Sequence, residues 1–241
     1  MAPLSKPSMS GPIESSASLQ ALIRLSSASL PVGGYSYSQG LEAAVGHARV
    51  SDLRLLREWL SSALVLWPRS DALMWALCYQ SLKGGQLDKL ADLNRLHWAS
   101  RDAAELRAET EQMGWSMIRL LFDINWLSDE LEDCLRSLRP PTFLAAHASA
   151  CWSQGIEMRA GLVSFCFSFV ESQVQAAQKL LPIGQAAGQR LISDLQPRID
   201  WCIEQTYLAL EQGESALHTS APMHAILCAR HEFQYSRLFR S

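Results

Sequence analysis

The 241-residue sequence predicts an all-α protein, a single-domain bundle of roughly ten helices with flexible N-terminal and C-terminal tails. Apolar residues recur at three- or four-residue spacing through most of the chain, which is the period of an amphipathic helix. No stretch alternates apolar and polar residues between hairpin signals, as a strand would. Hydrophobic residues make up 48% of the chain, a proportion typical of globular proteins and too high for a disordered one.

The first third of the chain gives clear helix boundaries. Residues 1–18 hold six Ser and three Pro with few large apolar groups, so we expect a disordered tail there. The helical domain is expected to span residues 19–232. Its first strongly periodic helix begins behind Ser51 and stops at Pro68. Two more should follow, one after Ser70 and Asp71 that stops at Gly84, and one over about 87–98.

A long amphipathic helix is predicted next. Leu106, Met113, Met117 and their neighbours form its apolar stripe. The opposite face carries charged residues and is therefore expected to face solvent. These are Arg101, Glu105, Glu109 and Glu111. Residues 123–133 contain five acidic side chains and no basic one, which is typical of a solvated loop and a helix start.

The last hundred residues should form the centre of the core and then the C-terminal tail. A helix is expected from Thr142 to about residue 155, and the next, over about 157–181, is apolar almost all round in its first half. Separate helices are predicted over about 185–195 and 198–210 because Pro197 lies between them. A short helix from Pro222 precedes the tail, residues 233–241.

Charge and composition exclude several classes of protein. The net charge is −3 and the pI is near 6.1, which argues against a nucleic-acid binder that relies on a basic surface. No secretory signal and no apolar run of membrane-spanning length is present, so we expect a cytoplasmic protein without membrane contact. The six cysteines are far apart and are expected to be reduced, buried, small hydrophobes.

No catalytic signature is found in the sequence. It contains neither a phosphate-binding GxxxxGK[ST] loop nor a dinucleotide-binding GxGxxG loop. HExxH and GxSxG are missing too. We therefore predict a protein that is not an enzyme and needs no cofactor.

Possible metal ligands occur at helical spacing. His224, Cys228 and His231 share one helix face, and His147 and Cys151 are also four residues apart. Two residues at i and i+4 can bind one ion, but two ligands do not make a tight site. The spacing favours a packed helix face over a stable metal site, and leaves a weak or transient ion contact open.

Three segments are hard to explain as core alone. Residues 30–42 mix tyrosines, glycines and small polar groups, residues 181–190 form a glycine-containing turn, and residues 235–240 place aromatic and cationic side chains on a terminus. Tyr, Phe and Arg are enriched at protein interfaces. An ordinary loop with aromatic anchors is the alternative for residues 30–42. The candidate partner-binding residues are Tyr35, Tyr37, Gln39, Glu42, Gln189, Arg190, His231, Glu232, Tyr235, Arg237, Leu238, Phe239 and Arg240.

These segments carry a family resemblance. LPVGGYSYSQGLE at residues 30–42 and YSRLFRS at 235–241 are long, specific strings, and AAELRAETEQMG at 103–114 and ARHE at 229–232 accompany them in order. From about residue 19 onward the chain resembles the UreF family of urease accessory proteins.

The resemblance implies a non-catalytic, helical assembly factor that forms homodimers. Such a protein would bridge a UreD-type (UreH-type) scaffold protein and the GTPase UreG, in a complex that delivers nickel to apo-urease. The C-terminal tail would dock onto the UreD-type partner. The alternative is a regulator that activates the GTPase in trans through an arginine such as Arg190 or Arg237. A helical metal-storage protein is a third, weaker hypothesis.

Two conformations of the tail are conceivable. Nine residues cannot bury their own aromatic side chains, and ordering the backbone costs about 1–2 kcal/mol per residue. We therefore expect a tail that is mobile in the free protein and ordered on its partner. The alternative is a tail that folds back and completes the core of its own domain.

Overall fold

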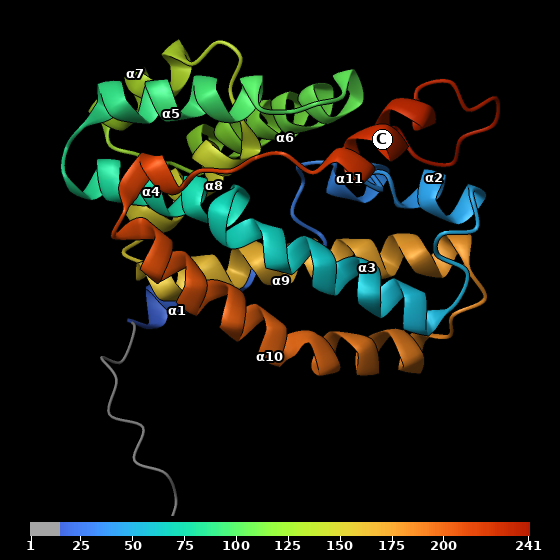
Figure 1. The fold of residues 1–241 in the computed structure, drawn as a ribbon. Coiled ribbons are helices and arrows are strands. Elements are labelled where there is room, and N and C mark those ends of the chain that lie inside the picture. Colours follow the sequence, from blue (N-terminus) through green and yellow to red (C-terminus); the bar gives the residue numbers. More distant parts are fainter. Residues whose placement is uncertain (1–14) are drawn as a thin grey trace, which may run out of the picture.

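The computed structural model describes residues 15–241, and the fold of this part is entirely helical (Figure 1). It contains eleven α-helices and three short 3-10 helices, without a strand among the described residues. The predicted fold class is therefore confirmed. The predicted disordered tail was placed too far along the chain, because helix α1 (Ser16–Leu25) already begins at Ser16, where the Ser15 hydroxyl accepts a hydrogen bond from the Ser18 amide. The rest of that tail lies outside the described residues.

The first half of the chain follows the expected boundaries closely. Helix α3 starts one residue later than the sequence suggested, because Asp52 and not Ser51 caps it through a bond from the Leu55 amide. The elements after α1 are η1 (Gly34–Ser36), α2 (Leu41–Gly46), α3 (Leu53–Leu66), η2 (Trp67–Arg69), α4 (Asp71–Lys83) and α5 (Leu87–Ala99).

The second half contains one correction. Pro197 does not divide two helices but lies inside one continuous helix, α10. Pro197 is exposed, so water can satisfy the backbone carbonyl that the proline leaves without a donor. The elements of this half are α6 (Ala104–Asp123), α7 (Asp129–Ser137), α8 (Phe143–Ser153), α9 (Met158–Leu180), α10 (Gln185–Leu210), η3 (Gly213–Ala216) and α11 (Pro222–His231).

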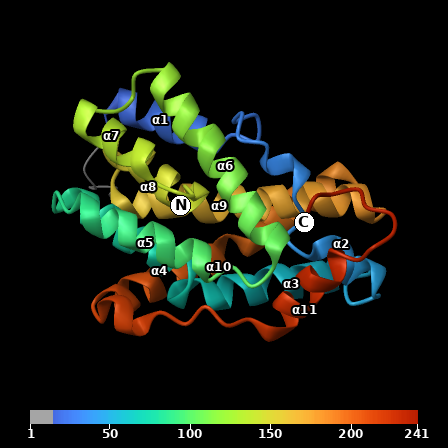
Figure 2. The same ribbon diagram turned by 90° about the horizontal axis from the view of Figure 1, so that it is seen from above.

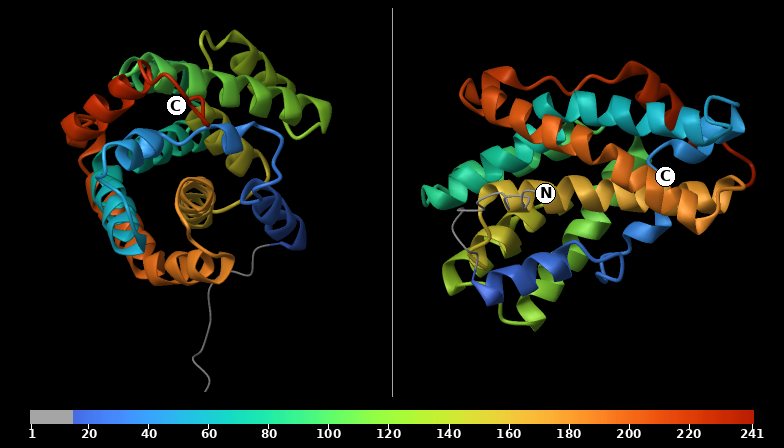
Figure 3. Two further views of the ribbon diagram at one scale, coloured as in Figure 1. Left: turned by 90° about the vertical axis from the view of Figure 1, so that its right-hand side faces the viewer. Right: turned by 90° about the horizontal axis from the view of Figure 1, so that it is seen from below.

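Helix α9 lies in the middle of the bundle, as its all-round apolar pattern predicted. Viewed nearly end-on in the left panel of Figure 3, it is surrounded by the other helices. It packs against α1, α3, α4, α8 and α10. No helix of residues 15–241 is both long and apolar enough to cross a membrane.

The centre of the core is built around Trp75 of α4, which is fully buried. Its indole N–H donates to Nδ1 of His147 on α8 at 3.1 Å. Gly161 of α9 faces the same indole, and a Cβ at that position would lie 2.5 Å from a Trp75 ring carbon. The bare glycine thus lets the central helix approach the tryptophan closely.

The chain ends close to where α11 stops, since His231 and the amides of Leu238 and Phe239 contact the same Glu42 carboxylate. After His231 it loops outward and returns to the middle of the molecule, close to α2 and α6 (Figure 2). None of the six cysteines is in a disulfide within residues 15–241; five are buried and Cys134 is half-buried.

Candidate partner-docking site

The C-terminal residues pair with the chain segment that precedes α2. The Arg240 amide donates to the Ser36 carbonyl at 2.9 Å, and the Ser38 amide donates to the Ser241 carbonyl at 2.8 Å. The Ser38 hydroxyl donates to the same carbonyl, and the side-chain amide of Gln173 on α9 donates to the Ser38 carbonyl at 3.0 Å. Two segments 200 residues apart in sequence are therefore joined by backbone hydrogen bonds.

Glu42, in the first turn of α2, holds the C-terminal segment. Its buried carboxylate accepts the backbone amides of Leu238 at 2.8 Å and Phe239 at 2.9 Å. Nε2 of His231 lies 3.2 Å from the same carboxylate, and the Gln234 side chain donates to it at 3.4 Å. All of these groups come from the end of the chain, so one carboxylate anchors several of its residues at once.

His231 lies between two carboxylates. Its ring is fully buried, with Nδ1 2.6 Å from Glu105 of α6 and Nε2 facing Glu42. The other Glu105 oxygen accepts from the Arg237 guanidinium at 2.5 Å. Glu232 adds a cap to α6, because its carboxylate accepts the Ala104 amide at 2.9 Å. The result is a continuous network that joins α2, α6 and the C-terminal segment.

Glu109 is a buried member of this network. Its carboxylate accepts from the Gln39 side chain at 2.6 Å and from the Ser241 hydroxyl at 2.7 Å. Burial raises the pKa of Glu109 to about 7. The sequence placed Glu105 and Glu109 on a solvent-facing helix face, which is wrong, because both face the C-terminal segment and are largely removed from water.

The C-terminal segment has an inner and an outer side. Phe239 is only 5% exposed, and the Lys179 ammonium lies 5.2 Å from its ring centre. Phe233, Tyr235 and Leu238 are 88%, 105% and 60% exposed. The structure thus differs from the expected free tail. The segment is bound to its own domain because Glu42 and Ser38 satisfy its backbone, a contribution the nine residues could not make alone.

The predicted partner-binding residues fall into three groups. Four are buried inside the fold, where a partner cannot touch them. These are Tyr37, Glu42, His231 and Phe239. Gln39 and Glu232 are half-buried, and the remaining members of the C-terminal segment and of residues 30–42 are exposed. These are Tyr35, Tyr235, Arg237, Leu238 and Arg240.

Gln189 and Arg190 are not brought to this network. Both are exposed on α10. The glycine of their segment, Gly188, faces α9, where a Cβ would lie 2.5 Å from the Gln178 side chain. The bare glycine thus lets α10 lie close to α9, on a part of the surface separate from the network around Glu42 and Glu105.

Two of the suggested metal ligands, His224 and Cys228, contact other groups of the protein instead. Nε2 of His224 lies 2.9 Å from the Gln39 carbonyl, and Sγ of Cys228 lies 3.6 Å from that same nitrogen. Burial raises the pKa of the Cys228 thiol to about 12. Among residues 15–241 no group of three or more His, Cys, Asp or Glu is placed to hold a metal ion.

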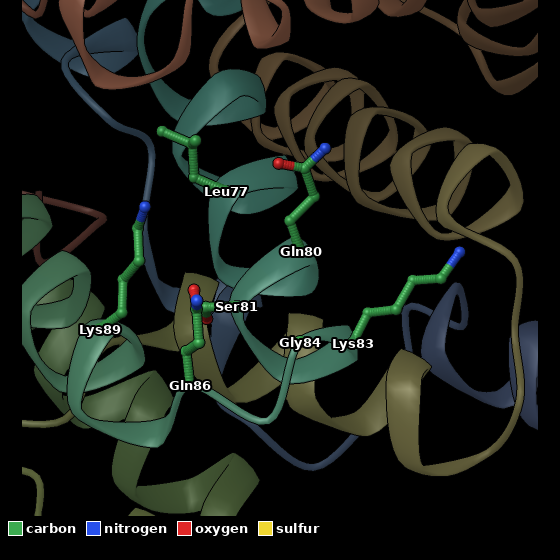
Figure 4. Close-up of a pocket in the computed structure, with 7 residues that line it drawn as sticks. All are labelled: Leu77, Gln80, Ser81, Lys83, Gly84, Gln86 and Lys89. Atoms are coloured by element: carbon green, nitrogen blue, oxygen red, sulfur yellow. The ribbon is translucent and has the colours of Figure 1, made fainter.

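A small hollow between the end of α4 and the start of α5 offers little for binding (Figure 4). It has a volume of about 370 Å³ and two lysines in its lining, Lys83 and Lys89. Figure 4 shows their side chains pointing away from each other, and Lys89 pairs with Glu214 at 3.3 Å. The two cations do not converge on a common ligand.

We call the contacts of Ser38, Glu42, Glu105, Glu109 and His231 with the C-terminal segment the docking network. Sequence reasoning missed Ser38, Glu105 and Glu109 as its members. All three lie inside the strings that carried the resemblance, at residues 30–42 and 103–114. Glu105 and Glu109 are also one helical turn apart, so both can face one neighbour. The periodicity alone could not show that this neighbour is the chain's own C-terminal end.

The family model and the relatives that match this chain carry the same family name, UreF. The family model described as UreF matches residues 50–196. The urease accessory protein UreF of Polynucleobacter asymbioticus is 38% identical over 224 residues, covering 92% of this chain and 97% of that protein. UreF of Ralstonia pickettii is 40% identical over 225 residues, covering 93% and 98%. The bifunctional urease accessory protein UreEF of Bordetella bronchiseptica is 41% identical over 92% of this chain and 52% of its own length.

Proposed function

Because the chain belongs to the UreF family of urease accessory proteins, we propose that it acts as a scaffold in urease maturation, bridging a UreD-type (UreH-type) protein and the GTPase UreG. In this role it supports nickel insertion into apo-urease without catalysing a reaction itself. We place it in the cytoplasm as a homodimer.

The observation that carries the proposal is the outer side of the C-terminal segment. Phe233, Tyr235 and Leu238 are exposed on a segment whose last residues Glu42 and Ser38 hold, through the amides of Leu238 and Phe239 and the carbonyl of Ser241. Large apolar side chains rarely stay exposed together on a monomer unless a partner covers them. Because the backbone is already ordered, binding would not incur the entropy cost of folding a free tail.

Helix α11 also carries two exposed apolar residues. Met223 and Ile226 are 57% and 49% exposed, on the helix that leads into the C-terminal segment. Arg237 contributes a guanidinium that is 41% exposed while it pairs with Glu105. Aromatic and aliphatic anchors beside an arginine are the composition of a protein interface.

Co-purification with a tagged UreD-type protein tests the docking side. Tyr235→Ala and Leu238→Ala should each weaken retention of the chain about 10- to 30-fold, the effect of losing an interface anchor worth about 2 kcal/mol. Leu208→Ala on α10 is the matched control, since Leu208 is also an exposed leucine, at 53%. Retention of both tail variants at the level of the control would contradict the docking role.

A GTPase-activating role is the alternative. It requires an arginine that can reach a nucleotide on a partner, and Arg190 is exposed on α10 with no ion pair recorded among residues 15–241. Arg237 is less suited because it already pairs with Glu105. GTP turnover by UreG in the complex separates the roles: Arg190→Ala should lower turnover with the complex intact if the arginine acts in trans, and should leave turnover unchanged for a scaffold.

A further inference from the structure

A large cavity lies beneath the segment that carries Tyr35 and Tyr37. It has a volume of about 610 Å³ and extends between α3, the corner joining α5 to α6, and α9. Aromatic side chains form much of its wall, with the Trp67 and Phe169 rings 4.5 Å apart and the Trp67 and Phe165 rings 5.2 Å apart. Such a cavity, mostly apolar with a few polar groups, is the usual form of a binding site.

The charged groups of the lining are predominantly acidic. Asp71, Asp102, Glu109 and Glu171 line the cavity, and the one guanidinium among the lining residues is that of Arg101. Arg101 pairs with Asp71 at 2.9 Å, so its charge is already balanced. No salt bridge recorded within residues 15–241 reaches Glu109, although its carboxyl group is buried. The cavity therefore carries an excess of negative charge beside aromatic faces.

Three lining residues also carry unpaired polar atoms, His97, Ser168 and Arg101. Nε2 of His97 faces the Asp71 carboxylate at 3.4 Å, and burial lowers the pKa of this histidine. A neutral ring that donates through Nε2 presents a bare lone pair at Nδ1, and this buried atom has no hydrogen-bond partner. The Ser168 hydroxyl is likewise unpaired, as is one donor, the Arg101 Nε–H. Nδ1 of His97 is therefore an acceptor that an N–H donor in the cavity would satisfy.

The cavity reaches the surface beside the docking network. Tyr35, Leu66 and Met223 belong to its lining and are 69%, 44% and 57% exposed. Gln39 and Glu109, which hold the C-terminal segment, line its interior. A partner that covers Tyr235, Leu238 and Met223 would therefore also lie over this opening.

We propose that the cavity receives a guanidinium or ammonium group on an apolar stem, supplied by an arginine or lysine side chain of the protein that docks on this face. The stem would lie against the aromatic walls, and the cationic N–H groups would donate to Glu109, Glu171 and the unpaired acceptors. An organic cation suits this lining better than a bare metal ion, because no three potential ligands are grouped for one within the described chain. The inference rests on the proposed function, since it names what the partner inserts.

Calorimetric titration of the full chain at about pH 8 with 1-butylguanidinium tests the site. We expect binding about tenfold tighter than that of 1-butanol, which has the same stem without the charge, and no detectable binding of butyrate. Glu109→Gln and Glu171→Gln should each weaken butylguanidinium binding about tenfold. Glu171 takes no part in holding the C-terminal segment, so its variant tests the cavity even if the Glu109 variant disturbs that segment. Glu111→Gln, on the same helix as Glu109 but outside the cavity, is the control.

Equal binding of the three probes, or binding unaffected by both cavity variants, would overturn the proposal. The source of the cation is tested on the complex with the UreD-type protein: the partner's side chain should displace butylguanidinium, and unchanged probe binding in the complex would contradict a partner-supplied cation. If no complex forms, the proposed function fails. The preference of the free chain for butylguanidinium is measured separately, so the two failures are distinguishable.

Discussion

Two fully buried histidines show how differently two regions of this protein are held together. His147, in the core, accepts a hydrogen bond from the Trp75 indole, and burial lowers its pKa to about 4. His231, in the docking network, lies between the Glu105 and Glu42 carboxylates. The core depends on neutral hydrogen bonds and close packing. The docking network depends on charged groups contributed by three distant parts of the chain, and it can therefore open without the core unfolding.

The largest effect is expected where the core is most tightly packed. Gly161→Ala places a Cβ 2.5 Å from the Trp75 ring, so α9 must shift, and we expect a loss of about 3 kcal/mol in the free energy of unfolding. Gly184→Ala is the control because its Cβ would meet no atom within 4 Å. Chemical denaturation measures both. Equal stability of the two variants would contradict close packing between α9 and Trp75.

The pH dependence of stability should have opposite signs in the two regions. The pKa of His147 falls to about 4, so between about pH 6.5 and pH 4 the unfolded chain binds a proton that the folded chain does not, and stability falls as pH falls. The pKa of Glu109 rises to about 7, so between about pH 4.5 and pH 7 the folded state holds the extra proton, and stability falls as pH rises.

Single variants separate these two contributions. Between about pH 7.5 and pH 5, His147→Gln should remove about 2 kcal/mol of acid destabilisation. Glu109→Gln should remove a contribution of the opposite sign. Denaturation at both pH values measures them, and identical pH profiles for the wild type and the two variants would contradict the assignment.

Opening the docking network should cost less global stability than disturbing the core. Glu42→Gln removes the carboxylate that receives the Leu238 and Phe239 amides and faces His231. Because the C-terminal segment can then detach alone, we expect a loss of about 1 kcal/mol in global stability. Protease sensitivity near residue 235 should rise at least about tenfold. A large cooperative loss of stability instead would place Glu42 in the core.

The smallest effect on stability should come from the outer side of the segment. Tyr235→Ala and Leu238→Ala remove exposed side chains, so the free energy of unfolding should change by less than about 0.5 kcal/mol. Thermal denaturation of the free chain provides the measurement. A drop of several degrees would show that these side chains pack against their own domain rather than await a partner.

The sequence predicted the helical fold well because its boundaries depend on local signals. Gly84 ends α4, Thr142 caps α8, and the all-round apolar pattern placed α9 at the centre. Pro197 misled because it lies exposed on α10, where water can replace the lost backbone hydrogen bond, while the helix as a whole packs against α9, α4 and α3. Local rules work where neighbouring residues decide the structure.

The docking network could not be predicted in the same way. Glu42, His231 and Phe239 were identified as partner-binding residues, yet their partners are one another and Glu105. Their contacts join residues more than 100 positions apart, which periodicity and capping signals do not encode. The structure divides the predicted segments into buried residues that contact one another and exposed residues whose partner binding stays a prediction.

The central claim is that the C-terminal segment is anchored to its own domain before any partner binds. Amide hydrogen exchange at Leu238 and Phe239 in the free protein tests it most directly, because both amides donate to the buried Glu42 carboxylate. The account predicts protection of at least about 100-fold for both amides, and loss of that protection in Glu42→Gln. The Tyr235 amide, which donates to no acceptor within residues 15–241, should exchange rapidly. Exchange of Leu238 and Phe239 at the rate of an unfolded chain would show a free tail and contradict the account.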